Sequence, residues 1–382
     1  GMAFINLGGF EVPQTEWVAK DSTDGFIIEL EEENYVSRLT YYCGLGKEAT
    51  YRVWYKSTNG EYEKIEDLME EDEFYKWKVL NIDAHLSHIM VRPTKPGGSI
   101  HEIGVFATDK NQPLAISITD LDGNPVDQSD PLYNLVDEQA IAKYTHNYKT
   151  GTYFDEIYHA RTAYEHLNQI KPYEWTHPPL GKILIGIGIK AFGMNTFGWR
   201  FVGTIIGAAM IPLMYLFGKK LFKRSLFGFC AAFLMMFDLM HFAQTRIATI
   251  DSYTTFFVIL MYYFMADYYL CRSYKKGFIR SLIPLFLSGL FFGLGAASKW
   301  SALYGAPGLA LIFFMAKYNE TKDYREYKKM DEQDRPAWVK SFIGKYWVGT
   351  LIACVFFFII IPAAIYLLSY IPYLRVEGMT FK

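Results

Sequence analysis

The sequence is short of cysteine and has no excess of basic residues. Four cysteines occur among 382 residues, and Cys43 is the only one in the polar first half. That half therefore contains no internal disulfide, and it must be stabilised by a core of its own. The 38 Lys and Arg residues against 40 Asp and Glu give a net charge of -2. No basic stripe is available to neutralise phosphates, which argues against nucleic acid as a partner.

A signal peptide is also missing from the start of the sequence. The run from Phe4 to Phe10 is too short to be one, and no basic residues precede it. A glycine precedes Met2, and the residues from Val376 onward run on without a helix end or a domain end. We therefore expect a piece of a longer protein, cut at both ends, with a further membrane span before residue 1.

Apolar residues are spread unevenly along the chain. Residues 1–178 are polar and include the acidic run Glu31-Glu32-Glu33, whereas from Leu180 onward apolar stretches alternate with short basic loops. The division predicts one part that suits water and one part that suits lipid.

Residues 1–130 are predicted to form an all-β domain outside the membrane. Runs rich in Tyr, Val, Ile and Trp alternate in polarity, as Tyr51–Tyr55 does, and turn signals such as Asn59-Gly60 separate them. Short strands at this spacing are typical of an antiparallel sandwich or jelly roll. The stretch resembles the discoidin or galactose-binding-like family, so sugar binding and a plain spacer role both stay open. The expected strands are 25–30, 37–43, 50–57, 74–80, 88–93, 100–107 and 114–118.

Residues 131–196 are predicted to form an outer loop with helices close to the membrane. Apolar residues at helical spacing predict helices over 137–148 and 155–170. The apolar stretch 180–192 is too short to cross a bilayer and carries Lys182 and Lys190. We therefore predict an interfacial helix there.

Residues 197–382 are predicted to form an incomplete transmembrane helical domain. Basic residues gather in alternate loops, at 219–224, 272–280 and 317–345. Positive charge collects on the cytoplasmic side of membrane proteins, so these loops face inward and the β-domain faces outward. About six spans are expected, over 197–217, 226–245, 252–270, 282–297, 302–316 and 346–370.

Ionisable residues on the predicted outer face are candidates for function, because polar groups at membrane depth are costly. A carboxylate among them could accept a proton as a general base. Cations among them could stabilise negative charge that develops during a reaction. The candidates of these types are Asp155, Glu156, His177, Lys182, Arg200, Arg246, Asp251 and Lys299.

Four short motifs occur in order along this part of the chain: Tyr153–His159, His177–Lys182, Arg246–Ser252 and Ser298–Trp300. Together they resemble the dolichyl-phosphate-mannose protein mannosyltransferase family, within the C-type membrane glycosyltransferases, over roughly residues 150–370. The β-domain stands where eukaryotic relatives have only a short segment. The resemblance is therefore greater to the bacterial branch, which depends on a polyprenyl-phosphate carrier.

The resemblance implies an inverting enzyme that is embedded in the cell membrane and needs a polyprenyl-phosphate-linked sugar, mannose or a similar one. Its acceptor would be a protein Ser or Thr hydroxyl on the outer face. A cell-wall glycan or a lipid is the alternative acceptor. A carbohydrate-binding transporter is the non-enzymatic alternative, but we find no paired repeat with broken helices of the kind that transporters have.

Each candidate residue also has a plainer interpretation. In the family that the chain resembles, the catalytic aspartate stands at the Asp155-Glu156 pair; Asp155 would be the base and Glu156 would orient the acceptor. Otherwise Asp155 caps a helix and Glu156 is a solvated first-turn residue. Asp251 could likewise cap a helix.

The basic candidates divide in the same way. Lys299 and Arg200, with Arg246 as a third, are candidates for binding the carrier phosphate, since Arg binds phosphate through two donors and Lys acts as a point charge. Snorkelling at the ends of spans is their plainer role. His177, which precedes two prolines, and Lys182 are candidates for substrate binding, although Pro also suits a helix start.

No cofactor is implied by these patterns. Glu156 and His159 are three residues apart on one predicted helix face and could hold a divalent metal. That spacing is common by chance, so no metal site is predicted.

Overall fold

The computed structural model describes residues 2–45, 48–57, 59–65, 69–70, 73–108, 110–376 and 378. The chain divides into two compact units. The β unit comprises residues 6–161 and 191–199, and the helical unit comprises residues 1–5, 162–190 and 200–382.

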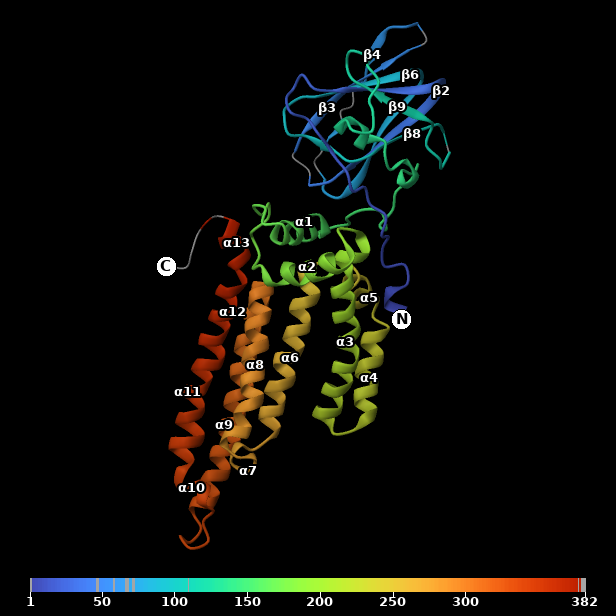
Figure 1. Ribbon diagram of the computed structural model, residues 1–382. Coiled ribbons are helices and arrows are strands. Elements are labelled where there is room, and N and C mark those ends of the chain that lie inside the picture. Colours follow the sequence, from blue (N-terminus) through green and yellow to red (C-terminus); the bar gives the residue numbers. More distant parts are fainter. Residues whose placement is uncertain are drawn as a thin grey trace. The chain divides into compact units, whose positions relative to one another are not determined.

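The β unit is built around one antiparallel sheet (Figure 1). Its strand order is β4-β3-β6-β2-β8, with β5 paired to β3 and β9 paired to β2; β1 and β7 form a separate two-stranded ribbon. The antiparallel all-β prediction is confirmed, and the jelly-roll assignment stays a prediction. The strands are β1 (Trp17–Val18), β2 (Phe26–Cys43), β3 (Thr50–Lys56), β4 (Tyr62–Lys64), β5 (Met69–Glu70), β6 (Lys76–Pro93), β7 (Ser99–Ile100), β8 (Ile103–Phe106) and β9 (Ile116–Thr119).

Two long strands replace four shorter ones that the sequence predicts. The expected strands 25–30 and 37–43 are one strand, β2, which pairs with β6 from Phe26↔Val91 to Cys43↔Lys76. The register shifts between Glu29 and Asn34, so the exposed acidic run that separates the two predicted strands is taken up as a bulge rather than as a turn. The core under this sheet includes Phe26, Ile28, Leu39, Val53, Leu86 and Ile89.

The segment after the sheet holds less helix than predicted. Of the helix expected over 137–148, only one 3-10 turn forms, η3 (Gln139–Ile141); another 3-10 turn, η2 (Pro131–Leu135), precedes that stretch. The Asp130 side chain caps η2 by accepting a hydrogen bond from the Leu132 N–H, at 2.8 Å. The boundary between the two units then falls inside helix α1 (Glu156–Leu167), which matches most of the predicted helix 155–170.

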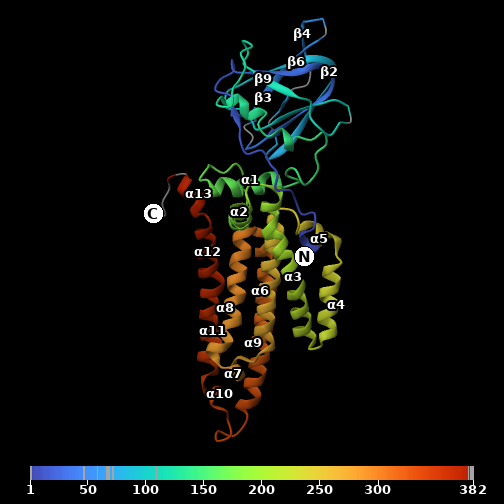
Figure 2. The same cartoon turned by 45° about the vertical axis from the view of Figure 1, so that its right-hand side comes forward.

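The six predicted spans are largely helical, although 226–245 is broken and 302–316 begins in a 3-10 turn. Figures 1 and 2 show α6, α8, α9 and the α11–α12 segment side by side within the helical unit. The predicted interfacial helix over 180–192 is α2, with the same limits. The elements are α2 (Leu180–Phe192), α3 (Thr196–Phe222), α4 (Ser225–Met236), α5 (Leu239–Gln244), α6 (Ile250–Leu270), α7 (Ser273–Lys276), α8 (Phe278–Ser298), η4 (Trp300–Gly305), α9 (Ala306–Lys328), α10 (Ala337–Ser341), α11 (Gly349–Val355), α12 (Ile361–Ser369) and α13 (Ile371–Val376).

Within the part of the chain that the structure describes, three helices are long and apolar enough to cross a membrane: Thr196–Phe222, Phe278–Ser298 and the continuous segment Ala337–Ser369. The last of these includes two π-helical stretches. The predicted span 226–245 is not one helix. It breaks after Met236, where the Asp238 side chain accepts the His241 N–H at 2.8 Å and starts α5. The other expected spans are helices whose crossing of a bilayer stays a prediction.

Candidate active site

A cleft of about 460 Å³ opens in the helical unit where the segment before α2 meets the η4 turn and the end of the chain's last long helix. Acidic, basic and aromatic side chains line it together. They are His166, Pro172, Glu174, Trp175, Thr176, His177, Pro179, Lys182, Trp300, Tyr370 and Tyr373. Two residues predicted from the sequence, His177 and Lys182, therefore share one cavity.

Local sequence explains how α2 presents these residues. Pro178 and Pro179 lack an N–H and fix φ near the helical value, so they suit the approach to a helix start. The Ile183 N–H already donates to the Pro179 carbonyl, at 2.9 Å. A methyl group added at Gly181 would lie 2.8 Å from Cγ2 of Ile250 at the start of α6. The glycine thus allows α2 to approach α6 closely, and it brings the next residue, Lys182, to the cleft.

Lys182 forms a buried ion pair with Glu174. The Lys182 side chain is only 1% exposed, and its ammonium group also donates to the Glu174 carbonyl at 3.2 Å. Burial lowers the Lys182 pKa, although the Glu174 contact opposes that effect. Burial would raise the Glu174 pKa, but hydrogen bonds from Lys182 and Thr176 outweigh it and hold that pKa below its usual value. The opposite charges of Lys182 and Glu174 neutralise each other among the residues that line the cleft. A ligand would have to displace Glu174 to reach Lys182.

A second ion pair joins Lys299 to Asp251, with Nζ 2.7 Å from Oδ1. Lys299 is the extended residue after α8 ends at Ser298, and Asp251 stands in the first turn of α6. The helix cap of α6 is Thr249, so Asp251 is not the cap that its plainer interpretation required. The Lys299 side chain is 27% exposed, which makes it the more accessible of the two lysines.

His177 lies among the charges of both pairs. Burial is the main cause that lowers its pKa; Lys299 and Lys182 lower it further, whereas Glu174 and Asp251 raise it. The imidazole is therefore neutral at pH 7, and it can offer one donor and one acceptor to a polar ligand.

The rest of the cleft is aromatic or neutral. Burial, with Lys182 as a second cause, lowers the pKa of His166 to about 4, so this histidine is also uncharged at neutral pH. Trp300 is more than half exposed, and its indole N–H donates to the Tyr366 hydroxyl at 3.2 Å. Flat rings and two neutral imidazoles thus line the cleft together with the Lys182–Glu174 pair.

Lys299 and Asp251 are not among the residues that line this cleft, and neither are Arg200 and Arg246. Arg200 is buried in α3, where its carbonyl accepts the Thr204 hydroxyl at 2.9 Å. The Arg246 guanidinium donates to the Ile5 carbonyl at 2.7 Å and lies 4.6 Å from the centre of the Phe242 ring. Their proposed contact with a phosphate stays a prediction.

The remaining predicted pair, Asp155 and Glu156, belongs to the β unit. Phe154, just before it, has a φ of +55°, a conformation that bulky side chains rarely adopt and that is more frequent at functional sites. Glu156 is fully buried, and its carboxylate accepts the Tyr153 N–H at 2.9 Å across this turn. Glu156 is therefore a residue that holds the turn, and not a solvated one.

Asp155 is half-buried at the start of α1. A helix cap would need its carboxylate to accept a backbone N–H, and among the residues that the structure describes this carboxylate accepts none; the Tyr158 and His159 N–H groups donate to the Asp155 carbonyl instead. The capping interpretation is not supported, and the carboxylate is available to a substrate.

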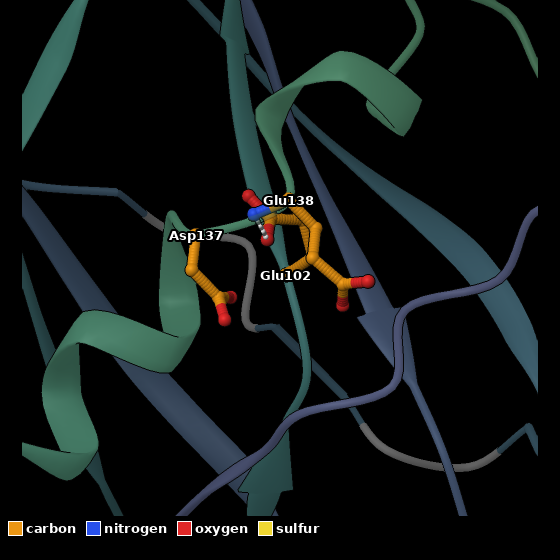
Figure 3. Close-up of side chains that lie close together, drawn as sticks. All are labelled: Glu102, Asp137 and Glu138. Atoms are coloured by element: carbon orange, nitrogen blue, oxygen red, sulfur yellow. Dashed lines mark hydrogen bonds between the residues drawn. The ribbon is translucent and has the colours of Figure 1, made fainter. Parts of the chain in front are cut away.

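Carboxylates with the spacing of metal ligands occur elsewhere in the β unit. Oxygens of Glu102, Asp137 and Glu138 lie within 4.8 Å of one another (Figure 3). Burial raises the Glu102 pKa to about 8, so its side chain is protonated at neutral pH. Glu102 oxygens already accept the Glu138 N–H, at 2.8 Å, and the Gln139 amide. Hydrogen bonding within the domain accounts for this cluster.

Glu174 and His166 are the site residues that the sequence did not reveal. Glu174 stands three residues before His177, in a stretch of Pro, Tyr and Trp that has no helical or strand period. The signal that could have found it is electrostatic: a lysine on an apolar helix needs a carboxylate partner once it is buried.

The match to a known family lies mainly in the helical unit. Residues 186–374 match the family described as Dolichyl-phosphate-mannose-protein mannosyltransferase. A Mycobacterium tuberculosis protein, Polyprenol-phosphate-mannose--protein mannosyltransferase, is 29% identical over 251 residues, which are 59% of this chain and 44% of that protein. The Corynebacterium glutamicum protein of the same name is 24% identical over 54% of this chain and 40% of its own length.

A eukaryotic relative is more distant. Dolichyl-phosphate-mannose--protein mannosyltransferase 3 of Saccharomyces cerevisiae is 23% identical over 60% of this chain and 31% of its own length. The chain thus spans less than half the length of the curated relatives that it matches.

Proposed function

Residues 186–374 belong to the dolichyl-phosphate-mannose-protein mannosyltransferase family, and from that premise we propose that the full-length protein is a membrane glycosyltransferase. It transfers mannose, or a similar sugar, from a polyprenyl-phosphate carrier to a protein Ser or Thr hydroxyl. The donor and the acceptor class are those in the names of the bacterial relatives.

The observation that carries this proposal is the cleft that holds the Lys182–Glu174 pair and the neutral His177 imidazole. The Lys299–Asp251 pair lies close enough to His177 to affect its pKa. A lipid-linked sugar phosphate brings one negative group and several hydroxyls. Lys299 is partly exposed beside His177 and can meet the phosphate, while the Asp251 carboxylate holds the ammonium in place. Charge-assisted contacts of this kind are stronger where water is excluded. The aromatic lining, which includes the exposed Trp300, suits the sugar's apolar faces.

The proposed transfer is a single displacement at the anomeric carbon of the sugar. The acceptor oxygen attacks the anomeric carbon of the sugar from the face opposite the phosphate, and the bond from that carbon to the phosphate oxygen breaks. The acceptor proton passes to a carboxylate, and polyprenyl phosphate leaves with the electron pair of the broken bond. Configuration at the anomeric carbon is inverted.

Asp155 is the proposed base. Its carboxylate is half-buried, it accepts no backbone N–H among the described residues, and it follows the strained residue Phe154. Glu156 keeps that turn in place through the Tyr153 N–H and is a positioning residue in this proposal. General bases of this type contribute about 10²- to 10⁴-fold to rate.

The site is proposed to face the outside of the cell membrane. The support is the distribution of charge: the loops 219–224, 272–280 and 317–345 are rich in Lys and Arg and would face the cytoplasm. Helix α2, which carries Lys182 at its first turn, would then lie in the outer interface.

The test is transfer of radiolabelled mannose from polyprenyl phosphate by membranes that contain the full-length protein. Asp155→Asn should lower the transfer rate about 10²- to 10⁴-fold while leaving protein abundance unchanged. Asp122→Asn, at an exposed turn of the same unit, is the matched control and should keep full activity. Equal transfer by wild type and Asp155→Asn would exclude Asp155 as the base, and no transfer by the wild type with any polyprenyl-phosphate sugar would reject the proposed function.

A further inference from the structure

A second cleft, of about 420 Å³, lies entirely within the β unit. It forms where β2 and the start of β6 meet the segment from Tyr144 to Tyr153. The residues that line it are Arg38, Lys76, Trp77, Val79, Tyr144, Thr145, His146, Asn147, Tyr148, Thr150, Gly151, Thr152 and Tyr153. We refer to it as the β cleft.

The register of β2 and β6 explains which of their side chains line the β cleft. Arg38 of β2 faces Asn81 of β6 in the sheet register, and side chains two residues apart on a strand share a face. Trp77 and Val79 therefore lie on the same face of the sheet as Arg38. His146 stacks on Trp77 with the ring centres 4.7 Å apart, which fixes the covering segment over the strands.

The β cleft carries one positive charge without a matching carboxylate. Among the described residues, no Asp or Glu lines it. Lys76 is paired with Glu73 at 2.7 Å, and burial lowers the His146 pKa to about 4, so this imidazole is neutral. Arg38 has no carboxylate partner among the described residues; its guanidinium lies 3.9 Å from the Tyr144 ring centre and makes one long hydrogen bond, 3.4 Å, to the Tyr144 carbonyl. A planar guanidinium with unused donors is suited to a carboxylate or a phosphate.

One edge of β6 beside this cleft is open. The strand pairs with β2 along most of its length, but β3 pairs only with its second half, from His88 to Pro93. Between Lys76 and Ser87 no strand of the described chain occupies the other edge. Val79, in this stretch, is an apolar side chain that is 43% exposed. An open strand edge with an exposed β-branched residue can pair with another extended chain.

The β cleft is also close to Asp155, the proposed base, along the chain. Tyr153 lines it, and Asp155 follows two residues later, which an extended chain spans in about 7 Å. The segment is held against the start of β6: the Thr152 N–H donates to the Tyr75 carbonyl at 3.1 Å, and a Cβ at Gly151 would lie 3.1 Å from Cα of Lys76. A ligand in the β cleft therefore lies close to Asp155.

We propose that the β cleft binds an extended, acidic segment of the acceptor polypeptide, which pairs with the free edge of β6 and places a carboxylate on Arg38. The inference rests on the proposed function, since it assigns the acceptor subsite of that reaction. It favours a peptide over an acidic saccharide because an open strand edge offers backbone donors and acceptors that only another chain can match in series. Acceptor hydroxyls flanked by Asp or Glu would be held beside Asp155.

The test measures binding to the full chain in detergent, with no sugar donor present. The probes are a peptide with one Thr flanked by Glu residues, the same peptide with Gln in place of Glu, and a galacturonate oligosaccharide. The acidic peptide should bind at least about ten-fold more tightly than the Gln peptide, since a charge-assisted contact is lost. Binding of the saccharide alone, or equal binding of both peptides, would overturn the proposal.

Variants then locate the site. Arg38→Gln should weaken the acidic peptide about ten-fold or more and leave the Gln peptide unchanged. Because Arg38 also packs on Tyr144, Val79→Glu is a second variant; it adds a repulsive charge at the exposed edge and should weaken the acidic peptide to a similar degree. Arg52→Gln, an exposed arginine on β3, is the matched control and should bind as wild type does. Unchanged binding by Arg38→Gln and Val79→Glu would exclude the β cleft.

The two proposals fail separately. If the acidic peptide binds through Arg38 but no sugar is transferred to it, the proposal that the β cleft binds a peptide is supported and the proposed function is rejected. If sugar is transferred to the acidic and the Gln peptide with equal KM, and Arg38→Gln leaves both KM values unchanged, the proposed function is supported. The proposal that the β cleft binds the acceptor peptide is then rejected.

Discussion

Lys299 and Asp251 are 48 residues apart in the sequence and meet at 2.7 Å, between the end of α8 and the first turn of α6. The contact joins the two helices near His177, whose pKa both charges affect, although neither residue lines the cleft itself. It leaves the ammonium partly exposed, whereas the Lys182–Glu174 pair is nearly closed to solvent. The two lysines are therefore expected to differ in function: Lys299 contacts the ligand, and Lys182 supports the wall.

Replacing Lys299 tests whether this residue contacts the donor. Lys299→Gln should raise the KM for the polyprenyl-phosphate sugar about 10- to 100-fold, since a hydrogen bond to a charged group is worth roughly 1.5–3 kcal/mol. Lys299→Arg keeps the charge and should recover part of the loss. Lys190→Gln, at an exposed position of α2, is the control. Donor kinetics in membranes decide the point, and an unchanged KM in Lys299→Gln would remove Lys299 from the donor site.

Close packing at Gly181 gives a second prediction. A methyl group there would lie 2.8 Å from Cγ2 and 3.0 Å from Cβ of Ile250, so Gly181→Ala must push α2 away from α6. Overpacking of this kind costs about 1–3 kcal/mol. We expect a lower melting temperature in detergent and a loss of transfer, because Lys182 moves with α2.

The control for Gly181 is Gly344→Ala, because nothing lies within 4 Å of the added atom there. Ile250→Ala removes the nearest atom, so Gly181→Ala should cost less in that background than in wild type. A double-mutant cycle with no coupling would show that the two residues do not limit the approach of the helices.

The accuracy of the sequence predictions varies between elements for physical reasons. The limits of α2 follow from local signals, since two prolines precede an apolar run that is too short for a span and ends near Gly193. The strands β2 and β6 were each predicted as two pieces. The polar stretches at Glu31–Glu33 and Asn81–His85 have the composition of turns, whereas the sheet continues through them by bulges and long-range pairing.

Some site residues could be predicted from the sequence and others could not. Lys182, His177, Lys299 and Asp251 stood out because ionisable groups at membrane depth are rare. Glu174 did not, because its importance comes from a partner eight residues away on a helix whose packing the sequence does not specify. The break at Asp238 was missed because the residues on both sides of it are apolar enough to continue a span.

Glu102 predicts how stability of the β unit depends on pH. Burial raises its pKa from 4.5 to about 8, so the folded state binds this proton more tightly than the unfolded state does. The stabilisation is complete below about pH 4.5 and is lost as pH rises through about 8. At about 1.4 kcal/mol per pKa unit, the loss is on the order of 2–5 kcal/mol.

Hydrogen exchange can measure this loss. Protection factors of β2 and β6 amides, corrected for the intrinsic effect of pH, should fall between pH 5 and pH 9. Glu102→Gln should show no such fall, because its amide does not ionise, whereas the exposed control Glu32→Gln should behave as wild type. A wild-type protein whose protection rises with pH would contradict a protonated Glu102.

The Lys182–Glu174 pair gives the last prediction, which separates support of the cleft from ligand binding. Glu174→Gln leaves a buried ammonium without its carboxylate, and removing one partner of a buried pair costs about 3–5 kcal/mol. Replacing both residues by apolar ones of similar size, as in Lys182→Met with Glu174→Leu, removes both charges and should restore most of the melting temperature. If Lys182 only supports the wall, the double variant should also recover the donor KM, because Lys299 still meets the phosphate. A double variant that regains its melting temperature but keeps a raised donor KM would instead make Lys182 a ligand of the donor, with Glu174 displaced when the donor binds.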